Sequence, residues 1–220
     1  MVSNNFDLLQ ELVLALKETF LMVSVSLIGA IIIGGLLGLF LFLTSNNLFL
    51  KNRVLNEISG VTINIIRSIP FIILLVLLIP LSKAIVHTTI GPSAVIVPLL
   101  VSAIAFYARL SEVSFRNVSK GVLESAVASG AKAIDIIIGI LIPEALPQLI
   151  NGITITAIAL IGYSAMAGTV GGGGIGNLAI QYGYERYNTT VMVICVVVLI
   201  VIVQALQLLG DFSSKRVNKK

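Results

Sequence analysis

Residues 19–50 are TFLMVSVSLIGAIIIGGLLGLFLFLTSNNLFL, a stretch of 32 residues without a charged side chain. A helix of about 20 apolar residues crosses the hydrocarbon core of a bilayer, so this stretch is long enough to span a membrane. The rest of the chain agrees: 57% of the 220 residues are hydrophobic, 11% are charged, and the mean hydropathy is +1.08. A soluble domain of this length could not bury so many apolar side chains, so an ordinary water-soluble fold is excluded.

Four more apolar runs follow the first one. We expect five membrane helices, at about residues 19–43, 58–81, 90–110, 148–170 and 188–210, in a single transmembrane domain that covers 14–211. The second run is interrupted by one charge, Arg67. The predicted fold class is therefore an all-α membrane protein. No internal repeat is visible, which disfavours a secondary carrier built from inverted repeats.

Basic residues indicate how the chain is oriented, because loops on the cytoplasmic side are enriched in Lys and Arg. With five spans, ten basic residues fall on one side and three (Lys17, Lys83 and Arg186) on the other. The ten are Lys51, Arg53, Arg109, Arg116, Lys120, Lys132, Lys215, Arg216, Lys219 and Lys220. We expect the C-terminus and the loops 44–57 and 110–147 to be cytoplasmic, with Lys215–Lys220 at the anionic inner leaflet. The pI near 9.3 reflects this bias, so nucleic-acid binding has little support.

The N-terminus is expected on the outer side and uncleaved. The first apolar run is too long for the core of a signal peptide, and the acidic residues Asp7, Glu11 and Glu18 precede it with Lys17 as the one positive charge. The single cysteine, Cys195, lies in the last apolar run and is expected to be a small buried hydrophobic residue.

The loop at about 112–147 is unusually apolar for a cytoplasmic connection. Its sequence permits helix from Lys120 to about Ile142 with a joint at Gly130, and we expect Pro143 and Pro147 to end that helix. Glu124 could cap a helix or pair with Arg116 or Lys120. The crowded isoleucines must be buried, either against the spans, against the membrane surface or against a partner protein.

The spacing in this loop is specific. Glu124-Ser125-Ala126 is followed after three residues by Gly130, and after nine more by Ile140-Leu141-Ile142-Pro143. This resembles the Glu-Ala-Ala loop with which permeases of ATP-binding-cassette importers bind their ATPase subunits, with Ser125 in place of Ala and Ile142 in place of Leu. The resemblance implies that the ATPase is contacted through this segment, and the residues expected to make the contact are Glu124, Ser125, Ala126, Ala128, Gly130, Ile140 and Pro143.

Further segments extend the resemblance to most of the chain, from about residue 14 to 211. Asn64–Phe71 (NIIRSIPF), Pro143–Pro147 (PEALP), Gly162–Gly168 (GYSAMAG) and Gln181–Tyr184 (QYGY) are similar to the permeases of methionine importers. The resemblance implies the type I importer permease fold, with five helices and cytoplasmic coupling helices. It also implies a bacterial inner (cytoplasmic) membrane, a second copy of the chain, two ATPase subunits, and an external substrate-binding protein or lipoprotein.

What the resemblance implies about activity follows from those partners. The chain would form the pathway for D- or L-methionine and would not be an enzyme, since ATP and Mg would be bound by the partner ATPase and no cofactor by this chain. Another sulfur amino acid or a methionine-containing peptide stays open as the substrate. An ion-coupled carrier or a membrane scaffold are the alternatives from other classes. The first would need acidic residues inside the spans, and none is seen.

Two segments inside the membrane are candidates for the pathway. Arg67, followed by Ser68 and by Pro70, which is expected to kink the helix, could face the pathway or clamp helices together through backbone carbonyls. In the run Gly162–Gly168, small residues would let two symmetry-related helices approach, and Met166 could fill the centre as an adaptable side chain. We hypothesise that Tyr163, Ser164 and Met166 line the gate, with ordinary helix packing as the alternative.

Two other patterns are judged not to be sites. Gly171, Gly173 and Gly176 match a dinucleotide fingerprint, but they follow a membrane helix instead of a strand, so a tight external turn or re-entrant segment is expected. No phosphate-binding G-x-x-x-x-G-K-[ST] sequence occurs. His87 has no cysteine or carboxylate cluster near it in sequence, so no metal site is expected.

Overall fold

The computed structural model describes the backbone of residues 2–217 and the side chains of residues 8–217. Lys219, Lys220 and the side chain of Asp7, used above to orient the chain, lie outside this part. The described residues form helices joined by short turns: α1 Val2–Gly29, η1 Ala30–Gly34, α2 Gly35–Ser45, α3 Arg53–Ser68, α4 Phe71–Leu77, α5 Ile79–Val86, α6 Pro92–Arg116, α7 Lys120–Ala128, α8 Ala133–Ile136, η2 Ile137–Leu141, α9 Ile142–Ala167, η3 Gly168–Val170, α10 Gly174–Leu178, η4 Ala179–Tyr184 and α11 Thr189–Val217.

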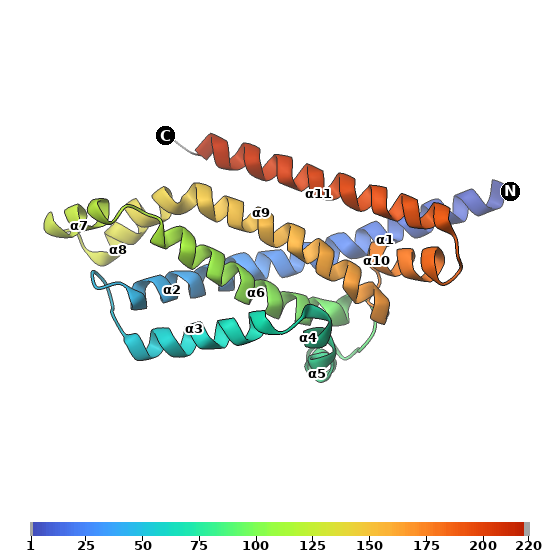
Figure 1. Ribbon diagram of the computed structural model, residues 1–220, viewed down its shortest axis with the longest axis horizontal. Coiled ribbons are helices and arrows are strands. Elements are labelled where there is room, and N and C mark those ends of the chain that lie inside the picture. Colours follow the sequence, from blue (N-terminus) through green and yellow to red (C-terminus); the bar gives the residue numbers. More distant parts are fainter. Residues whose placement is uncertain (1, 218–220) are drawn as a thin grey trace.

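Within the described residues, four continuous helical segments are long and apolar enough to cross a membrane: Leu8–Ser45, Pro92–Arg116, Ala133–Val170 and Thr189–Val217. A fifth span exists if α3 and α4, which meet at 103°, are counted together. The loops separate to the two ends of the bundle, with α7 and α8 beside the α2–α3 turn at one end and α10 near the N-terminus at the other (Figure 1). This agrees with the predicted all-α membrane fold.

The first long helix packs closely on α6 because glycines line the contact. A Cβ atom on Gly34 would lie 2.8 Å from the Ile104 carbonyl oxygen, and one on Gly38 would lie 2.6 Å from that of Ala108. Small residues allow such backbone approach between membrane helices, where packing replaces the hydrophobic effect as the main attraction. The main core, built around Met22, Leu99 and Leu160, fills the space between α1, α6 and α9.

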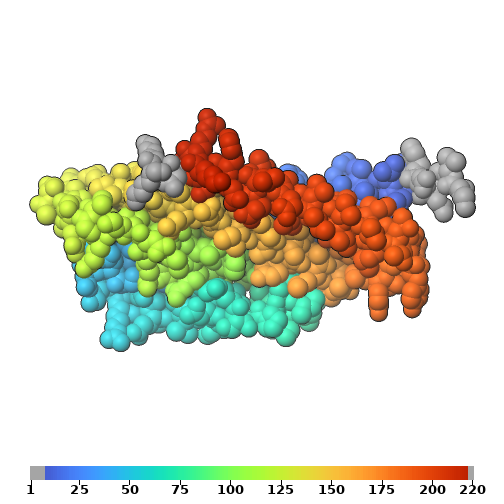
Figure 2. Space-filling view, turned by 45° about the horizontal axis from the view of Figure 1, so that its top comes forward, coloured from blue at the N-terminus to red at the C-terminus, as the bar shows by residue number. Residues whose placement is uncertain are grey.

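The outer edges of the bundle differ from this centre. In both views, α3 and α4 form one edge and α11 forms the opposite edge (Figures 1 and 2). One residue of α3, Ile63, is buried, compared with about half of α6. Much of α3 is therefore available to lipid, water or a second protein chain.

The prediction that Pro143 and Pro147 end the loop helix is wrong. The helix runs without interruption from Ala133 to Val170 and passes through both prolines. A wider π-helical turn, η2, lies just before Pro143, and the Ile142 N–H donates to the Ile137 carbonyl, five residues back. Such a turn accommodates a proline ring that an ordinary α-turn would exclude. The Pro147 carbonyl accepts a hydrogen bond from the Ser214 hydroxyl of α11 at 3.0 Å.

The predicted span at 58–81 is divided instead of straight. Helix α3 ends at Ser68, Ile69 is extended, and Pro70 precedes α4. The residue before a proline avoids the α-helical region, and proline has no N–H to continue the hydrogen-bond ladder. The kink expected at Pro70 is therefore present, but it is large enough to turn α4 and α5 across the bundle (Figure 1).

Candidate functional site

The loop between α6 and α9 is a helical hairpin with its joint at Gly130, as predicted. Gly130 has a φ of +79°, and it follows the end of α7. Its N–H donates to the Val127 carbonyl at 3.0 Å, and the Ala131 N–H donates to Ala126 at 3.3 Å. This is the usual way in which a left-handed residue closes a helix, and side chains with a Cβ rarely adopt it. The chain turns sharply here and enters α8.

The hairpin has a buried side and an exposed side. Leu123, Ala126 and Ile136 are buried against Phe42 and Phe115, which belong to α2 and α6. Glu124, Ser125, Ala128, Gly130 and Pro143 are exposed, and Ile140 is half-buried. Of the seven residues predicted to contact the ATPase, Ala126 alone is buried within the chain. The other positions form a surface at the end of the bundle, attached to α6 by the apolar side chains beneath.

Two acidic residues near this end have defined partners. Glu124 pairs with Lys120 at 3.1 Å, one turn back on α7, which is one of the alternatives given above. Arg116 pairs instead with Glu112, at 2.7 Å. Glu112 is 1% exposed and also accepts from Arg109 at 2.6 Å. Sequence reasoning missed Glu112, although its spacing of three and four residues from the two arginines could have indicated the pairs.

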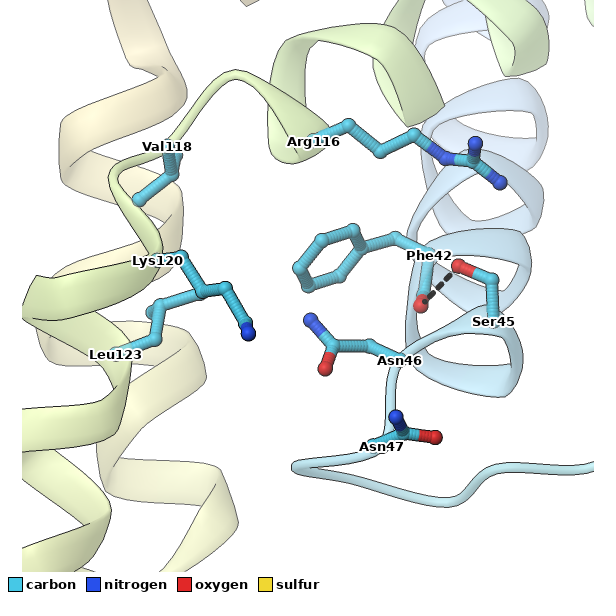
Figure 3. A pocket seen from close by; sticks show the side chains of 8 residues that line it. All are labelled: Phe42, Ser45, Asn46, Asn47, Arg116, Val118, Lys120 and Leu123. Carbon is cyan, nitrogen blue, oxygen red and sulfur yellow. Dashed lines mark hydrogen bonds between the residues drawn. The ribbon is translucent and has the colours of Figure 1, made fainter.

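A hollow of about 320 Å³ separates the start of the hairpin from the end of α2 (Figure 3). The Lys120 ammonium and the Asn46 amide project into it from opposite walls, with Leu123 on the wall of Lys120 and Phe42 on the wall of Asn46 (Figure 3). Its lining consists of Phe42, Ser45, Asn46, Asn47, Arg116, Val118, Lys120 and Leu123. The hairpin and α2 therefore do not pack closely around this point.

The two candidate segments inside the membrane lie close together. The ring of Phe71, the first residue after the break at Pro70, stacks on the Tyr163 ring with a centroid distance of 4.6 Å and an interplanar angle of 10°. Arg67 and Ser68, on the other side of the break, are exposed. The end of α3 and the run Gly162–Gly168 are thus held against each other through an aromatic pair, although about 95 residues separate them in sequence.

The three hypothesised gate residues have different surroundings. Met166 is 50% exposed, and Tyr163 is half-buried in its contact with Phe71. Ser164 is 2% exposed, and its hydroxyl donates to the Ile161 carbonyl of its own helix at 2.8 Å. Met166 is therefore available to a pathway or to another chain, whereas Ser164 serves local packing in this conformation.

The glycine-rich segment after Gly162–Gly168, here called the gate run because it contains the hypothesised gate residues, forms the expected tight turn, and it is attached to α1. The Glu18 carboxylate accepts from the Gly174 N–H at 2.7 Å, and the Thr19 hydroxyl accepts from the Ile175 N–H at 2.9 Å. These residues were not singled out from the sequence, because contacts across 156 positions leave no local pattern. They fix the end of the gate run relative to the first helix.

Comparisons with known proteins place this arrangement in a family. A family model described as "Binding-protein-dependent transport system inner membrane component" matches residues 30–220. The chain is 45% identical over 216 residues to a probable D-methionine transport system permease protein of Vibrio cholerae, covering 98% of this chain and 95% of that protein. It is 45% identical over 180 residues to a methionine import system permease protein of Bacillus subtilis, covering 82% and 81%.

The fold has a close counterpart among solved structures. A chain from a methionine ABC transporter in an inward-facing conformation superposes with a TM-score of 0.93 and 43% sequence identity, and the match covers 96% of this chain and 98% of that one. A chain from an amino acid ABC transporter, with 21% identity and a TM-score of 0.73, has the same fold.

Proposed function

Since the chain belongs to the family of binding-protein-dependent transport system inner membrane components, we propose that it forms the translocation pathway of a methionine importer. It is a permease subunit and not an enzyme. The closely similar permeases named for methionine or D-methionine support the substrate class, D- or L-methionine. The observation that carries the proposal is the exposed hairpin that turns at Gly130 with the spacing of an ATPase-binding loop.

In this proposal two copies of the chain assemble with two ATPase subunits, which bind ATP and Mg, and with an external substrate-binding protein. The exposed positions Glu124, Ser125, Ala128 and Gly130 contact the ATPase. The buried side of the hairpin, at Leu123 and Ile136, transmits its movement to α6 and α9. The hairpin and the C-terminus face the cytoplasm, and the N-terminus faces outward, because the basic residues gather at the hairpin end.

The gate lies near the opposite side of the membrane. Met166 is exposed in the single chain and is placed to meet its counterpart in the second copy, with Tyr163, Arg67, Ser68 and Pro70 beside it. A flexible thioether can fill such a centre in the closed state and withdraw when the helices separate. ATP binding brings the ATPases together, closes the cytoplasmic ends and opens the gate, and hydrolysis restores the inward-facing state.

Reconstitution tests the proposal. Vesicles that contain the chain, its ATPase and the loaded binding protein should take up labelled methionine, and only when ATP is present on the ATPase side. Gly130→Ala should lower the amount of ATPase that copurifies, because an L-residue at this φ costs about 1–2 kcal/mol and the turn would relax. Gly121→Ala is the matched control, since Gly121 lies within α7 and a Cβ there meets no atom closer than 4.0 Å.

The outcomes separate the parts of the proposal. Loss of ATPase with Gly130→Ala and retention with Gly121→Ala would support the hairpin as the coupling element. Equal retention in both variants would contradict it. A reconstituted complex that hydrolyses ATP in response to another loaded binding protein, and takes up no methionine, would contradict the substrate.

A further inference from the structure

Arg67 is a charged residue whose position inside the membrane needs a compensating environment. It lies in the last turn of α3, directly before the break at Pro70, and its side chain is exposed. Among residues 8–217, no carboxylate forms an ion pair with it; the ring of Phe106 lies 6.0 Å from its guanidinium carbon. An unpaired arginine facing hydrocarbon costs several kcal/mol, so such residues face water-filled pathways or other polar groups.

One face of α3 is polar, and it marks the side of the helix on which that polar environment lies. Arg53, Glu57, Gly60, Asn64 and Arg67 recur at intervals of four and three residues and so share one face of the helix. We call these five residues the polar stripe. It is distinct from the side that packs on the bundle, where Ile63 and Ile66 contact Leu41 and Ala108.

A second exposed face of α3 is apolar and suits lipid or another chain. It consists of Val54, Ile58, Val61 and Ile65, which are between 56% and 65% exposed. A helix with separate polar and apolar exposed faces cannot be surrounded by lipid on both of them. The polar stripe therefore borders an aqueous space that exists only in the assembled transporter.

The polar stripe extends from the cytoplasmic end of the bundle to the gate. Arg53 and Glu57 pair with each other at 2.7 Å at its first end, near the α2–α3 turn. Arg67 ends the stripe, and the next helix begins with Phe71 stacked on Tyr163. The ten-position separation of Glu57 and Arg67 corresponds to about 15 Å of helix, so the Glu57 carboxylate is too far away to neutralise Arg67.

The side chains at the Arg67 end of the polar stripe can bind the α-carboxylate of an amino acid. A guanidinium donates two parallel hydrogen bonds to a carboxylate, and the exposed Asn64 amide, one turn back, offers a further N–H donor. Free D- and L-methionine both have an α-carboxylate, whatever their side chain. The negative end of the α3 dipole stabilises the arginine charge while the site is empty.

We propose that Arg67, together with Asn64, is a transient binding site for the α-carboxylate of the amino acid on the inner side of the gate. This inference rests on the proposed function, because it assigns a substrate contact within that pathway. The substrate leaves the binding protein, passes Met166, and is held briefly by Arg67 before it reaches the aqueous space along the polar stripe. Arg67 thus acts on translocation, not on ATPase binding.

The test compares charge variants in reconstituted vesicles. Arg67→Gln should lower methionine uptake about tenfold, the amount expected for loss of one charge-assisted hydrogen bond, while ATPase copurification is unchanged. Arg67→Lys should recover uptake to within about threefold, since it keeps the charge but loses the bidentate geometry. Arg53→Gln is the control, because Arg53 lies on the same stripe and pairs with an exposed carboxylate far from the gate.

A chemical test separates carboxylate binding from helix clamping. In a Cys195→Ala background, the Arg67→Cys variant should react with water-soluble methanethiosulfonates. The aminoethyl reagent should restore uptake, and the sulfonatoethyl reagent should not. An unreactive thiol, equal effects of both reagents, or normal uptake by Arg67→Gln would overturn the inference alone. Failure of the unchanged complex to take up methionine would overturn the proposed function and this inference with it.

Discussion

Helices α3 and α6 lie side by side, but they differ in how closely they are packed and in how their charges are paired (Figure 1). Helix α6 is the centre of the bundle: its glycine-lined contact with the first helix is tight, and its one acidic residue, Glu112, is buried between two arginines. Helix α3 has one buried residue, and its intramembrane charge, Arg67, is exposed without an acidic partner in the described residues.

This difference indicates that α6 stabilises the single chain, whereas the exposed faces of α3 serve the proposed assembly. Close packing and paired charges hold α6 in place, and in the proposed transporter the hairpin moves this helix as a unit, through Phe115 and Leu123. The exposed faces of α3 are uncovered in the single chain, and in the proposed assembly they border a second copy and a water-filled pathway. Matched changes on the two helices should therefore have unequal effects.

The largest expected effect is on packing at the centre. Gly38→Ala should lower the free energy of unfolding by about 2–3 kcal/mol, because its Cβ would lie 2.6 Å from the Ala108 carbonyl oxygen and from the Ser111 Cβ, and the helices must separate. Gly60→Ala, on α3, meets no atom within 4 Å and should stabilise slightly through higher helix propensity.

Thermal unfolding of the detergent-purified chain measures this difference. Cys195 is the single cysteine and is fully buried, so a thiol-reactive fluorescent dye reports unfolding directly. An equal fall in the unfolding temperature for Gly60→Ala and Gly38→Ala would contradict the claim that α6 is tightly packed and α3 is not.

A smaller effect is expected from the paired charges. Glu112→Gln should lower the free energy of unfolding by about 1–2 kcal/mol, because it removes the buried counter-charge of Arg109 and Arg116. The effect is limited because both guanidiniums are partly exposed to solvent. Glu57→Gln, which removes the exposed partner of Arg53 on α3, should change stability by less than about 0.5 kcal/mol. The same dye assay ranks the two; similar losses in both variants would mean that Glu112 is no more important than a surface pair.

Much of this architecture could be predicted from local features of the sequence. Apolar runs predicted the long apolar helices, because bilayer thickness sets the length of a span. The positive φ at Gly130 and the Lys120–Glu124 pair follow from neighbours three to six residues away. The break at Pro70 was expected as a kink, but its 103° angle was not. Phe71 stacks on Tyr163 directly after the break, and no local pattern predicts this contact between distant parts of the chain.

The failures have the same physical origin. Pro143 and Pro147 were expected to end a helix, but the wider turn η2 accommodates the chain before Pro143, and the helix continues through both residues. The attachment of Glu18 and Thr19 to the turn at Gly174 joins segments that are far apart in sequence. The burial of Ser164 and the exposure of Met166, two residues further on, depend on how α9 packs, which the run itself does not encode; their assignment to the gate stays a prediction.

Cross-linking at Met166 tests the central claim most directly, namely that the exposed faces beside the gate meet their counterparts in a second copy. In a Cys195→Ala background, the Met166→Cys variant of the assembled complex should form a disulfide between two copies in the nucleotide-free, inward-facing state. Trapping the ATPases with ATP should reduce the yield, because the gate opens. Absence of a cross-link in both states, in a complex that still takes up methionine, would contradict the account.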